Sequence, residues 1–377
     1  MAPKRSKGAG ALEQKTEVNH KTVLSPAPVS SRSNDLYAAL DLGTNSCRML
    51  IARPEGGGFH VVDSFSKSVQ LGAGLEKTGR LSRGSMSRTI QALRICQQKL
   101  RRNKVKRMRL VATEACRRAL NGADFMRRIT RETGLTLDII APEQEAQLAV
   151  ISCAPLVSKK TENLLVVDIG GGSTELVWID ISGVPKRDRA QSIMRLHGGF
   201  VQAKTDIPAA RVVDWISVPL GVATLRDQFS DVEDDAARFA LMSWFFEENL
   251  TDFTPYQSAQ PQERFQIVGT SGTVTTVAAS HLGLNRYDRT KVDGMHMTSQ
   301  QIDKVIHNYL AMGPEGRRVD PCIGHDRSAL IMSGAAILQA LMRCWPTDRL
   351  SVADRGLREG LLYAQMSADG VLEEGTF

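Results

Sequence analysis

Two turns of one pattern, far apart in the chain, constrain its fold more than any other feature. The first reads Asp-Leu-Gly-Thr-Asn-Ser over residues 41–46, and the second reads Asp-Ile-Gly-Gly-Gly-Ser over residues 168–173. Each turn joins two apolar segments of strand length. The turns lie 127 residues apart, far beyond the spacing of a solenoid repeat. The pattern therefore predicts the duplication of a whole domain.

The segments between and after these turns alternate between the periods of strands and helices. In the first half we expect strands at 36–40, 47–52, 59–64, 108–112 and 135–140, and helices at 84–102, 121–134 and 143–157. In the second half we expect strands at 163–167, 176–180 and 265–268, a third glycine-rich turn at 269–273 that opens an apolar helix, and a last amphipathic helix that begins within 354–360. This order predicts an α/β fold of two domains with a cleft between them.

The chain of 377 residues is 42% apolar, which is enough for two packed cores. We expect a disordered basic tail over 1–34, a first domain over 35–156, a second domain over 157–345, and a C-terminal helix within 346–377 that packs back on the first domain. No run of about 18 apolar residues occurs, and no apolar stretch follows the basic N-terminus, so neither a transmembrane helix nor a signal peptide is expected. Six scattered cysteines predict reduced thiols and a cytoplasmic protein rather than disulfides or zinc.

The net charge of +7 is distributed unevenly along the chain. Residues 1–34 carry +4 and residues 80–131 carry +14, which leaves −11 for the rest. Such a basic part predicts a polyanionic ligand, although a solvated surface or an RNA-binding patch would have the same composition. No aromatic residue interrupts the basic run 99–109, so stacking on single-stranded nucleic acid is not supported and nucleic acid is not the expected partner.

The two matching turns have the chemistry of a phosphate cradle. Glycines let backbone N–H groups approach an anion, and hydroxyl groups can donate to phosphate oxygens. The hydroxyls in question belong to Thr44, Ser46, Ser173 and Thr174. The Asp that opens each turn would repel phosphate, so we expect it to hold a divalent cation or to orient water. The two turns are expected to face each other across the cleft, with the third turn capping it.

Four motifs occur in order along the chain: residues 41–46, Asp-Ile-Gly-Gly-Gly-Ser-Thr-Glu at 168–175, Gly-Thr-Ser-Gly-Thr at 269–273, and Asp-Arg-Gly-Leu-Arg-Glu-Gly at 354–360. Smaller matches occur at 71–75, 113–117, 143–146 and 217–221. With these motifs the chain resembles the exopolyphosphatase / guanosine pentaphosphate phosphatase (Ppx/GppA) family, from about Leu36 to the C-terminus. The resemblance implies duplicated actin-like (ribonuclease H-like) domains of the actin, heat-shock chaperone and sugar-kinase (ASKHA) superfamily, with an interdomain cleft. Each domain is then expected to be a mixed five-stranded sheet flanked by helices.

The resemblance also implies hydrolysis of a terminal phosphoanhydride by an activated water. The implied catalytic residues are Glu145, Asp168 and Glu175, with Glu145 as the water-activating glutamate. The implied metal ligands are Asp41, Asp168 and Glu175; Mg²⁺ is the expected cofactor, and a requirement for K⁺ stays open. The expected phosphate-binding residues are Gly43, Thr44, Asn45, Ser46, Arg48, Arg117, Gly170, Gly171, Gly172, Ser173, Gly269, Ser271 and Gly272.

Ordinary structural roles remain open for several of these side chains. Glu145 lies near the start of a helix, where a Glu also interacts favourably with the helix dipole, and Glu143 competes with it for the role of base. Arg48 in a strand could form a structural ion pair, and Arg117 could belong to a solvated helix face. Cys47 is not expected to act as a nucleophile, because no His is placed by the sequence to activate it.

The expected activity is removal of terminal phosphate from inorganic polyphosphate, which the basic segment favours. Conversion of guanosine pentaphosphate (pppGpp) to the tetraphosphate is the nearest alternative. Two rivals are a kinase or chaperone-like ATPase of the same fold and a non-catalytic sensor of polyphosphate or guanosine penta/tetraphosphate. RNA binding through the tail and residues 99–109 is a weaker alternative. The carboxylates argue against a pure sensor, because a protein that only binds polyanions has no need of them.

Longer family members continue into a helical region with a His-Asp motif. The sequence here stops shortly after the helix expected at 357–366, so we expect that region to be absent. The absence leaves the processivity on long polymers and the formation of a homodimer open. His325 and Asp326 are adjacent but lie inside the second domain, so they are not that motif.

Overall fold

The computed structural model describes residues 35–198, 209–257 and 264–372, so the tail predicted over 1–34 lies outside the described residues. The first sheet is mixed and five-stranded, as predicted. Its strands, in spatial order, are β3 (Gly58–Ser68), β2 (Ser46–Glu55), β1 (Tyr37–Leu42), β4 (Arg107–Ala112) and β5 (Asp138–Ile139). The central strand β1 pairs antiparallel with β2 and parallel with β4.

The second sheet repeats this arrangement and adds a strand. Its strands, in spatial order, are β8 (Arg211–Val218), β7 (Thr174–Asp180), β6 (Asn163–Ile169), β9 (Phe265–Thr270), β11 (Leu350–Ala353) and β10 (His296–Met297). The central strand β6 pairs antiparallel with β7 and parallel with β9, as β1 does with β2 and β4. The repeated topology confirms the predicted duplication. The expectation of five strands is wrong for this sheet, because β10, of two residues, is too short to have a visible period.

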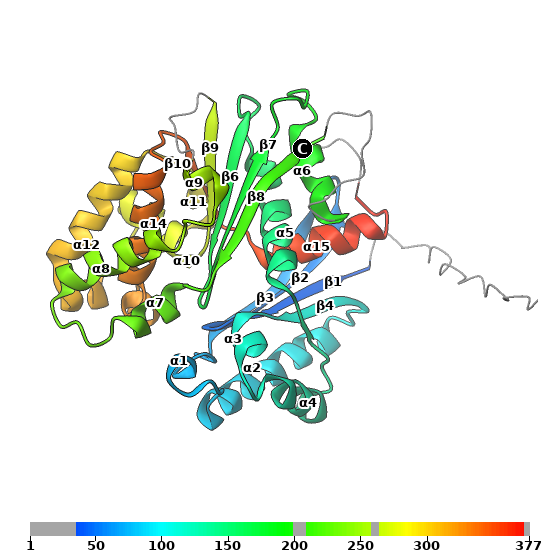
Figure 1. Cartoon of the computed structure of the whole chain (residues 1–377). Coiled ribbons are helices and arrows are strands. Elements are labelled where there is room, and N and C mark those ends of the chain that lie inside the picture. Colours follow the sequence, from blue (N-terminus) through cyan, green and yellow to red (C-terminus); the bar gives the residue numbers. More distant parts are fainter. Residues whose placement is uncertain (1–34, 199–208, 258–263, 373–377) are drawn as a thin grey trace, which may run out of the picture. The chain divides into compact units, whose positions relative to one another are not determined.

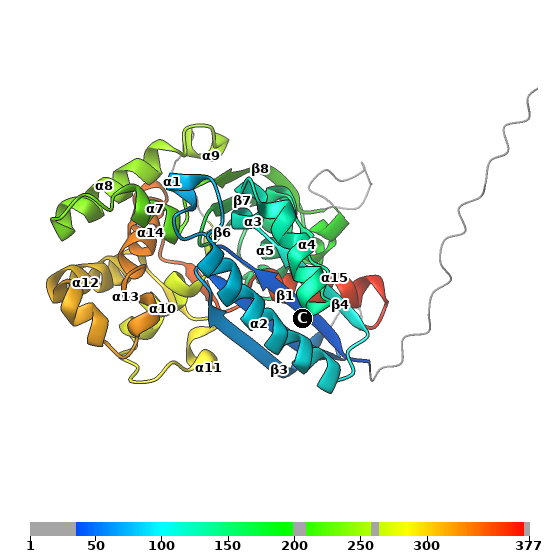
Figure 2. The same cartoon turned by 90° about the horizontal axis from the view of Figure 1, so that it is seen from below.

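Helices connect and cover the strands (Figures 1 and 2). In the first half they are α1 (Leu75–Thr78), α2 (Arg83–Arg102), α3 (Glu114–Arg118), α4 (Gly122–Thr133), α5 (Pro142–Cys153) and the 3₁₀ turn η1 (Ala154–Leu156). In the second half they are α6 (Arg189–Met194), η2 (Arg195–Gly198), α7 (Val222–Gln228), α8 (Asp235–Glu248), α9 (Thr254–Gln257), α10 (Gly272–His281), α11 (Arg289–Val292), α12 (Ser299–Val319), α13 (His325–Ser328), α14 (Ile331–Cys344) and α15 (Leu357–Ala368). None of the described helices is both long and apolar enough to cross a bilayer.

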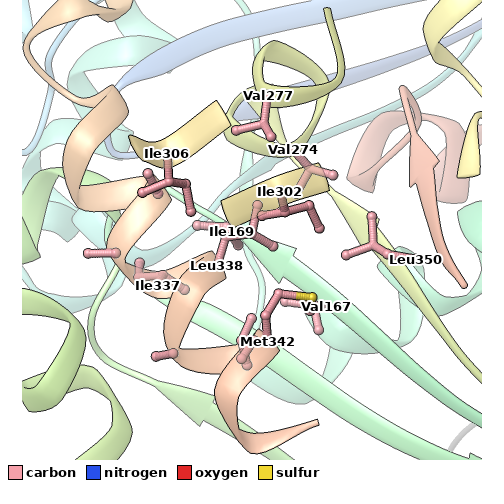
Figure 3. Packing of buried hydrophobic residues seen from close by; sticks show 14 of the residues in the cluster. Val167, Ile169, Val274, Val277, Ile302, Ile306, Ile337, Leu338, Met342 and Leu350 are labelled. Atoms are coloured by element: carbon pink, nitrogen blue, oxygen red, sulfur yellow. The ribbon is translucent and has the colours of Figure 1, made fainter. Parts of the chain in front are cut away.

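Helix α5 packs between the two sheets. Leu148 and Ile151 of α5 pack with β1 and α15 in one buried cluster, whereas Ala146 and Val150 pack with β6 and β7 in another. Helices α2 and α4 cover the opposite face of the first sheet, as Figure 1 shows below the strands. The largest cluster covers the opposite face of the second sheet. There, apolar side chains from β6, α10, α12 and α14 point toward one another (Figure 3).

Strand periodicity aims the motif residues toward α5. Successive side chains of a strand point to opposite faces. In β1, Leu40 and Leu42 pack toward α2, so Asp41 between them points to the face covered by α5 and α15. In β6, Val167 and Ile169 belong to the large outer cluster, so Asp168 points to the α5 side. The two predicted aspartates thus approach the same helix from different sheets.

Candidate active site

A cleft of about 310 Å³ has walls from both halves of the chain. It is lined by the turns at 43–46 and 170–173, the first turn of α10, residues 353–358 at the start of α15, and the side chains of Asp41, Arg48, Glu114, Glu145, Asp168, Tyr287 and Arg327, among others. Most residues predicted from the sequence to bind phosphate therefore lie in one cleft. Arg117, Glu175 and Gly269 do not belong to its walls as described.

The two predicted turns have the same internal geometry and touch each other. The amide of Gly43 donates to the Ser46 carbonyl over 3.0 Å, and that of Gly170 donates to the Ser173 carbonyl over 2.9 Å. A Cβ atom added at Gly172 would lie 2.6 Å from Thr44 Oγ1, so glycine is required for this close approach. Thr44 Oγ1 is buried and has no hydrogen-bond partner within the described structure, which leaves it free to bond a ligand oxygen.

The third predicted turn brings the N-terminus of α10 to the cleft. The Ser271 side chain accepts hydrogen bonds from the amides of Thr273 and Val274, which caps the helix. Ser271 has φ 152°, a conformation that non-glycine residues rarely adopt and that is frequent at functional sites. A helix N-terminus attracts anions through its unpaired amides and its dipole. Gly269, which the sequence predicts to bind phosphate, does not line the cleft. It lies within β9 and packs against the Val274 side chain.

Glu145 belongs to the first turn of α5 and lines the cleft, whereas its competitor Glu143 is exposed and does not. Burial raises the pKa of Glu145 well above its usual range, and the charges of Glu175 and Asp41 raise it further. Arg117 opposes this rise, since its guanidinium lies 3.4 Å from the Glu145 carboxylate. A buried carboxylate with a raised pKa is the arrangement expected of a general base.

Arg117 is held by more than Glu145. It donates to the carboxylate of Glu114 over 2.5 Å and to the carbonyl of Ile140 over 2.7 Å. Glu114 is itself buried and lines the cleft. The sequence predicts a phosphate contact for Arg117, but the structure gives it two carboxylate partners. Its neighbour Arg118 is exposed and pairs with Glu76, so only Arg118 resembles a solvated helix face.

The remaining predicted acids lie on the α5 side of the sheets. Asp41 and Asp168 line the cleft, and burial raises the pKa of both. Glu175 lies opposite Asp168 in the β6–β7 register. Glu175 is 2% exposed and accepts hydrogen bonds from the hydroxyls of Ser173 and Ser217. Burial raises the pKa of Glu175 to about 7, although both hydroxyls oppose the rise.

Four arginines among the described residues line the cleft: Arg48, Arg327, Arg358 and Arg355, the last of which is paired with Asp293. Arg48, predicted from the sequence, has no ion-pair partner within 4.0 Å among the described residues, and burial together with the charge of Arg358 lowers its pKa. Arg358 and Arg327 were not predicted. Arg358 belongs to the motif at 354–360, which could have drawn attention to it. No sequence motif marks Arg327. It extends from α13 into the cleft wall, where it donates to Thr276 Oγ1 over 2.6 Å.

Equivalent positions of the two halves carry opposite charges. Arg48 lies opposite Asp41 in the β1–β2 register, at the position that Glu175 occupies opposite Asp168. The first half thus pairs an acid with a cation, and the second half pairs two acids. Cys47, next to Arg48, is buried, and its contact with Cys96 together with burial raises the pKa of its thiol, which disfavours a nucleophilic thiolate.

The carboxylates fit a weakly coordinated Mg²⁺ better than a closed metal centre. Among the described residues, no three His, Cys, Asp or Glu side chains converge closely enough to form a metal site. Protein Mg²⁺ is commonly held by one or two carboxylates, with waters and substrate phosphates completing the shell. Asp41 and Asp168 supply two such carboxylates. The charge of Asp41 raises the pKa of Asp168, and a bound cation would oppose that repulsion.

A model of the Ppx/GppA phosphatase family matches residues 50–369. The chain belongs to this family. It is 30% identical to the family member from Aquifex aeolicus, whose crystal structure superimposes with a TM-score of 0.68 over 89% of this chain and 98% of the other. An exopolyphosphatase from Cytophaga hutchinsonii, 20% identical, has the same fold, with a TM-score of 0.72 over 91% of this chain and 100% of the other.

The curated relatives of this family member are longer than the chain. A guanosine-5'-triphosphate,3'-diphosphate pyrophosphatase of Aeromonas salmonicida is 29% identical over 335 residues, which are 88% of this chain and 59% of the relative. The corresponding protein of Aeromonas hydrophila is 28% identical over the same length. The chain therefore spans about three fifths of the curated relatives that it matches. The predicted duplicated actin-like fold is confirmed by the neighbours in this family.

Proposed function

We propose that this protein hydrolyses the terminal phosphoanhydride of pppGpp, with Glu145 as general base. The observation that carries the proposal is the Glu145 carboxylate, 12% exposed in the wall of a cleft that the two matched glycine turns also line. The names of the two Aeromonas relatives support the guanosine substrate. The positive charge of residues 80–131 instead favours inorganic polyphosphate. Polyphosphate remains the second candidate, because both ligands offer a polyphosphate end.

In the proposed reaction a water oxygen attacks the terminal phosphorus. A new P–O bond forms, the bond to the bridging oxygen breaks, and the water proton passes to the Glu145 carboxylate. Amides of the turns at 43–46 and 170–173 and of the α10 N-terminus would bind the phosphate oxygens, and Arg48 would neutralise part of their charge. When bound by Asp41 and Asp168, Mg²⁺ would neutralise further charge on the phosphates.

A cytoplasmic setting belongs to the same proposal. All six cysteines are free thiols. Free thiols are typical of a reducing compartment.

The test is phosphate release from pppGpp and from long-chain polyphosphate, measured side by side with Mg²⁺. The variant Glu145→Gln keeps the size of the side chain and removes the base, so we expect kcat to fall by about two to four orders of magnitude. Glu143→Gln is the matched control, because Glu143 lies in the same helical turn but is exposed.

The outcomes separate the candidates. Faster turnover of pppGpp supports the proposal, and faster turnover of polyphosphate assigns the main activity to the polymer. Binding of pppGpp or polyphosphate without phosphate release would indicate that the protein is a non-catalytic sensor. If Glu143→Gln lowers kcat as much as Glu145→Gln, the assignment of the base is wrong.

A further inference from the structure

One aromatic side chain stands out in a cleft otherwise built for phosphate. Among the described residues that line the cleft, Tyr287 is the only aromatic one. It lies between α10 and α11 and remains 39% exposed. Phosphate recognition needs amides, hydroxyls and cations, and none of these functions calls for an exposed ring. We therefore expect the Tyr287 ring to contact a part of the ligand other than its phosphates.

The polar end of Tyr287 is anchored. Burial raises its pKa, and so does the contact of its hydroxyl with the Asp354 carboxylate, so the hydroxyl keeps its proton and donates. The Thr275 hydroxyl also contacts it. Asp354 is held in turn by Arg289, whose Nε lies 3.4 Å from the carboxylate and whose Nη2 donates to the Asp354 carbonyl over 2.6 Å. A ring fixed at one end loses little entropy when a flat ligand group stacks on it.

The contact with Thr275 also holds the Tyr287 ring near the N-terminus of α10. Thr275 belongs to the first turn of α10 and donates to the Ser271 carbonyl over 2.9 Å. Arg327 lines the cleft as well and donates to the Gly272 carbonyl over 3.4 Å. The ring therefore stands beside the helix N-terminus at which a phosphate would bind. A nucleotide bound there by its phosphates would have its base within reach of the ring.

We propose that Tyr287 is the stacking platform for the base of a guanosine nucleotide, and that it sets the preference for the nucleotide over a linear polymer. The inference rests on the proposed function, which it deepens. Purine rings stack on aromatic side chains in offset geometry, and the interaction is favourable for any base. Linear polyphosphate has no base, so the ring contributes nothing to its binding.

The experiment compares Tyr287→Ala and Tyr287→Phe with the wild-type protein on both substrates. We expect Tyr287→Ala to raise KM for pppGpp by about 5- to 100-fold, with kcat nearly unchanged, because stacking is the same in the ground and transition states. For polyphosphate, both parameters should stay within about twofold of wild type. Tyr287→Phe keeps the ring and should stay close to wild type on pppGpp. Trp244→Ala is the control, because Trp244 is 55% exposed on α8 and does not line the cleft.

Three results would overturn the inference. An unchanged KM for pppGpp in Tyr287→Ala would mean that the ring does not touch the base. An equal loss on both substrates would assign Tyr287 a purely structural role. A loss in Tyr287→Phe as large as that in Tyr287→Ala would assign the effect to the hydroxyl.

Failure of the proposed function would look different. If the wild-type protein hydrolyses only polyphosphate, inhibition of that reaction by pppGpp becomes the measurement. Inhibition that Tyr287→Ala weakens supports the base site. Inhibition that it leaves unchanged, or the absence of inhibition of the wild-type protein, contradicts it.

Discussion

The Arg117 guanidinium lies 3.4 Å from the Glu145 carboxylate. The candidate base is therefore neither isolated in an apolar pocket nor fully neutralised, since Arg117 also bonds Glu114. Because Arg117 is shared with Glu114, it lowers the pKa of Glu145 less than an exclusive partner would. The pair thus adjusts the pH at which Glu145 becomes a base.

Replacing Arg117 should move the pH dependence of activity. Glu145 acts only when deprotonated, and Arg117 lowers its pKa. In Arg117→Met the pKa rises further, so the acid limb of kcat/KM should shift to higher pH, and activity should fall more at low pH than at high pH. The measurement is kcat/KM between pH 5 and 9, with Arg128→Met, whose partner is Glu132 on the same helix, as control. A uniform loss at every pH would instead indicate the phosphate contact predicted from the sequence.

Glu175 should make the metal-free protein less stable at high pH. Its folded pKa, about 7, lies above the ordinary value of 4.5, so the folded state binds the proton more tightly than the unfolded state. The contribution of Glu175 to the free energy of unfolding is fully present below about pH 4.5. It is lost as the pH rises toward 7. Glu175→Gln removes this loss, and we expect it to gain about 1 to 3 kcal/mol relative to wild type between pH 5 and 8.

The check is thermal unfolding in the presence of a chelator, recorded across that pH range. The exposed Glu248, replaced by Gln, is the control and should show no such trend. A difference in Tm between Glu175→Gln and wild type that stays constant with pH would contradict the assignment.

Gly172 should tolerate no side chain. An added Cβ would lie 2.6 Å from Thr44 Oγ1 and 2.7 Å from Glu114 Cγ, both in buried residues, so the two turns would have to separate. We expect Gly172→Ala to lower kcat/KM by about 10- to 100-fold and stability by about 1 to 3 kcal/mol. Gly183→Ala is the control, because nothing lies within 4 Å of a Cβ there. Equal behaviour of the two variants in activity and unfolding assays would argue against the contact.

The basic end of α2 should matter only for a long polymer. The exposed side chains of Arg101, Arg102, Lys104 and Lys106 form no ion pair within the described structure. They precede β4, whose other end adjoins the cleft residue Thr113, so they lie about 20 Å from the cleft. Replacing all four by Ser should raise KM for long polyphosphate about tenfold at low salt and leave pppGpp unaffected.

Replacement of Lys159 and Lys160, exposed elsewhere, is the control for general loss of charge. Initial rates at increasing salt provide the readout. If the four-residue variant lowers turnover of pppGpp as well, the segment does not act as a track for the polymer.

Local patterns in the sequence predict the positions of the two turns and of the acids that open them. Asp41 and Asp168 each follow a continuous apolar run that predicts a buried strand, but the face to which each side chain points is seen only once the neighbouring residues have packed. Glu145 follows from the family motif, and its raised pKa could not have been predicted, because burial between two sheets depends on packing.

The residues and elements that the sequence does not predict belong to short segments, or to segments that meet only in the folded chain. Helix α3 has five residues, too few for a helical period, so the partners of Arg117 were not foreseen. Arg327 belongs to the four-residue helix α13 and Tyr287 to the loop before α11, and only the packing around α10 brings them to the cleft. Strand β10 is invisible for the same reason of length.

Arg48 and Glu175 occupy equivalent positions of the two halves but carry opposite charges. This difference depends on both halves belonging to one chain. Two identical chains related by a twofold axis would have to place the same side chain at both positions, either two cations or two acids. Joining two copies in a single polypeptide removes that restriction. A cation can then stand in one half and a carboxylate at the equivalent position of the other, so a single chain can carry a difference in charge that two identical chains related by a twofold axis cannot.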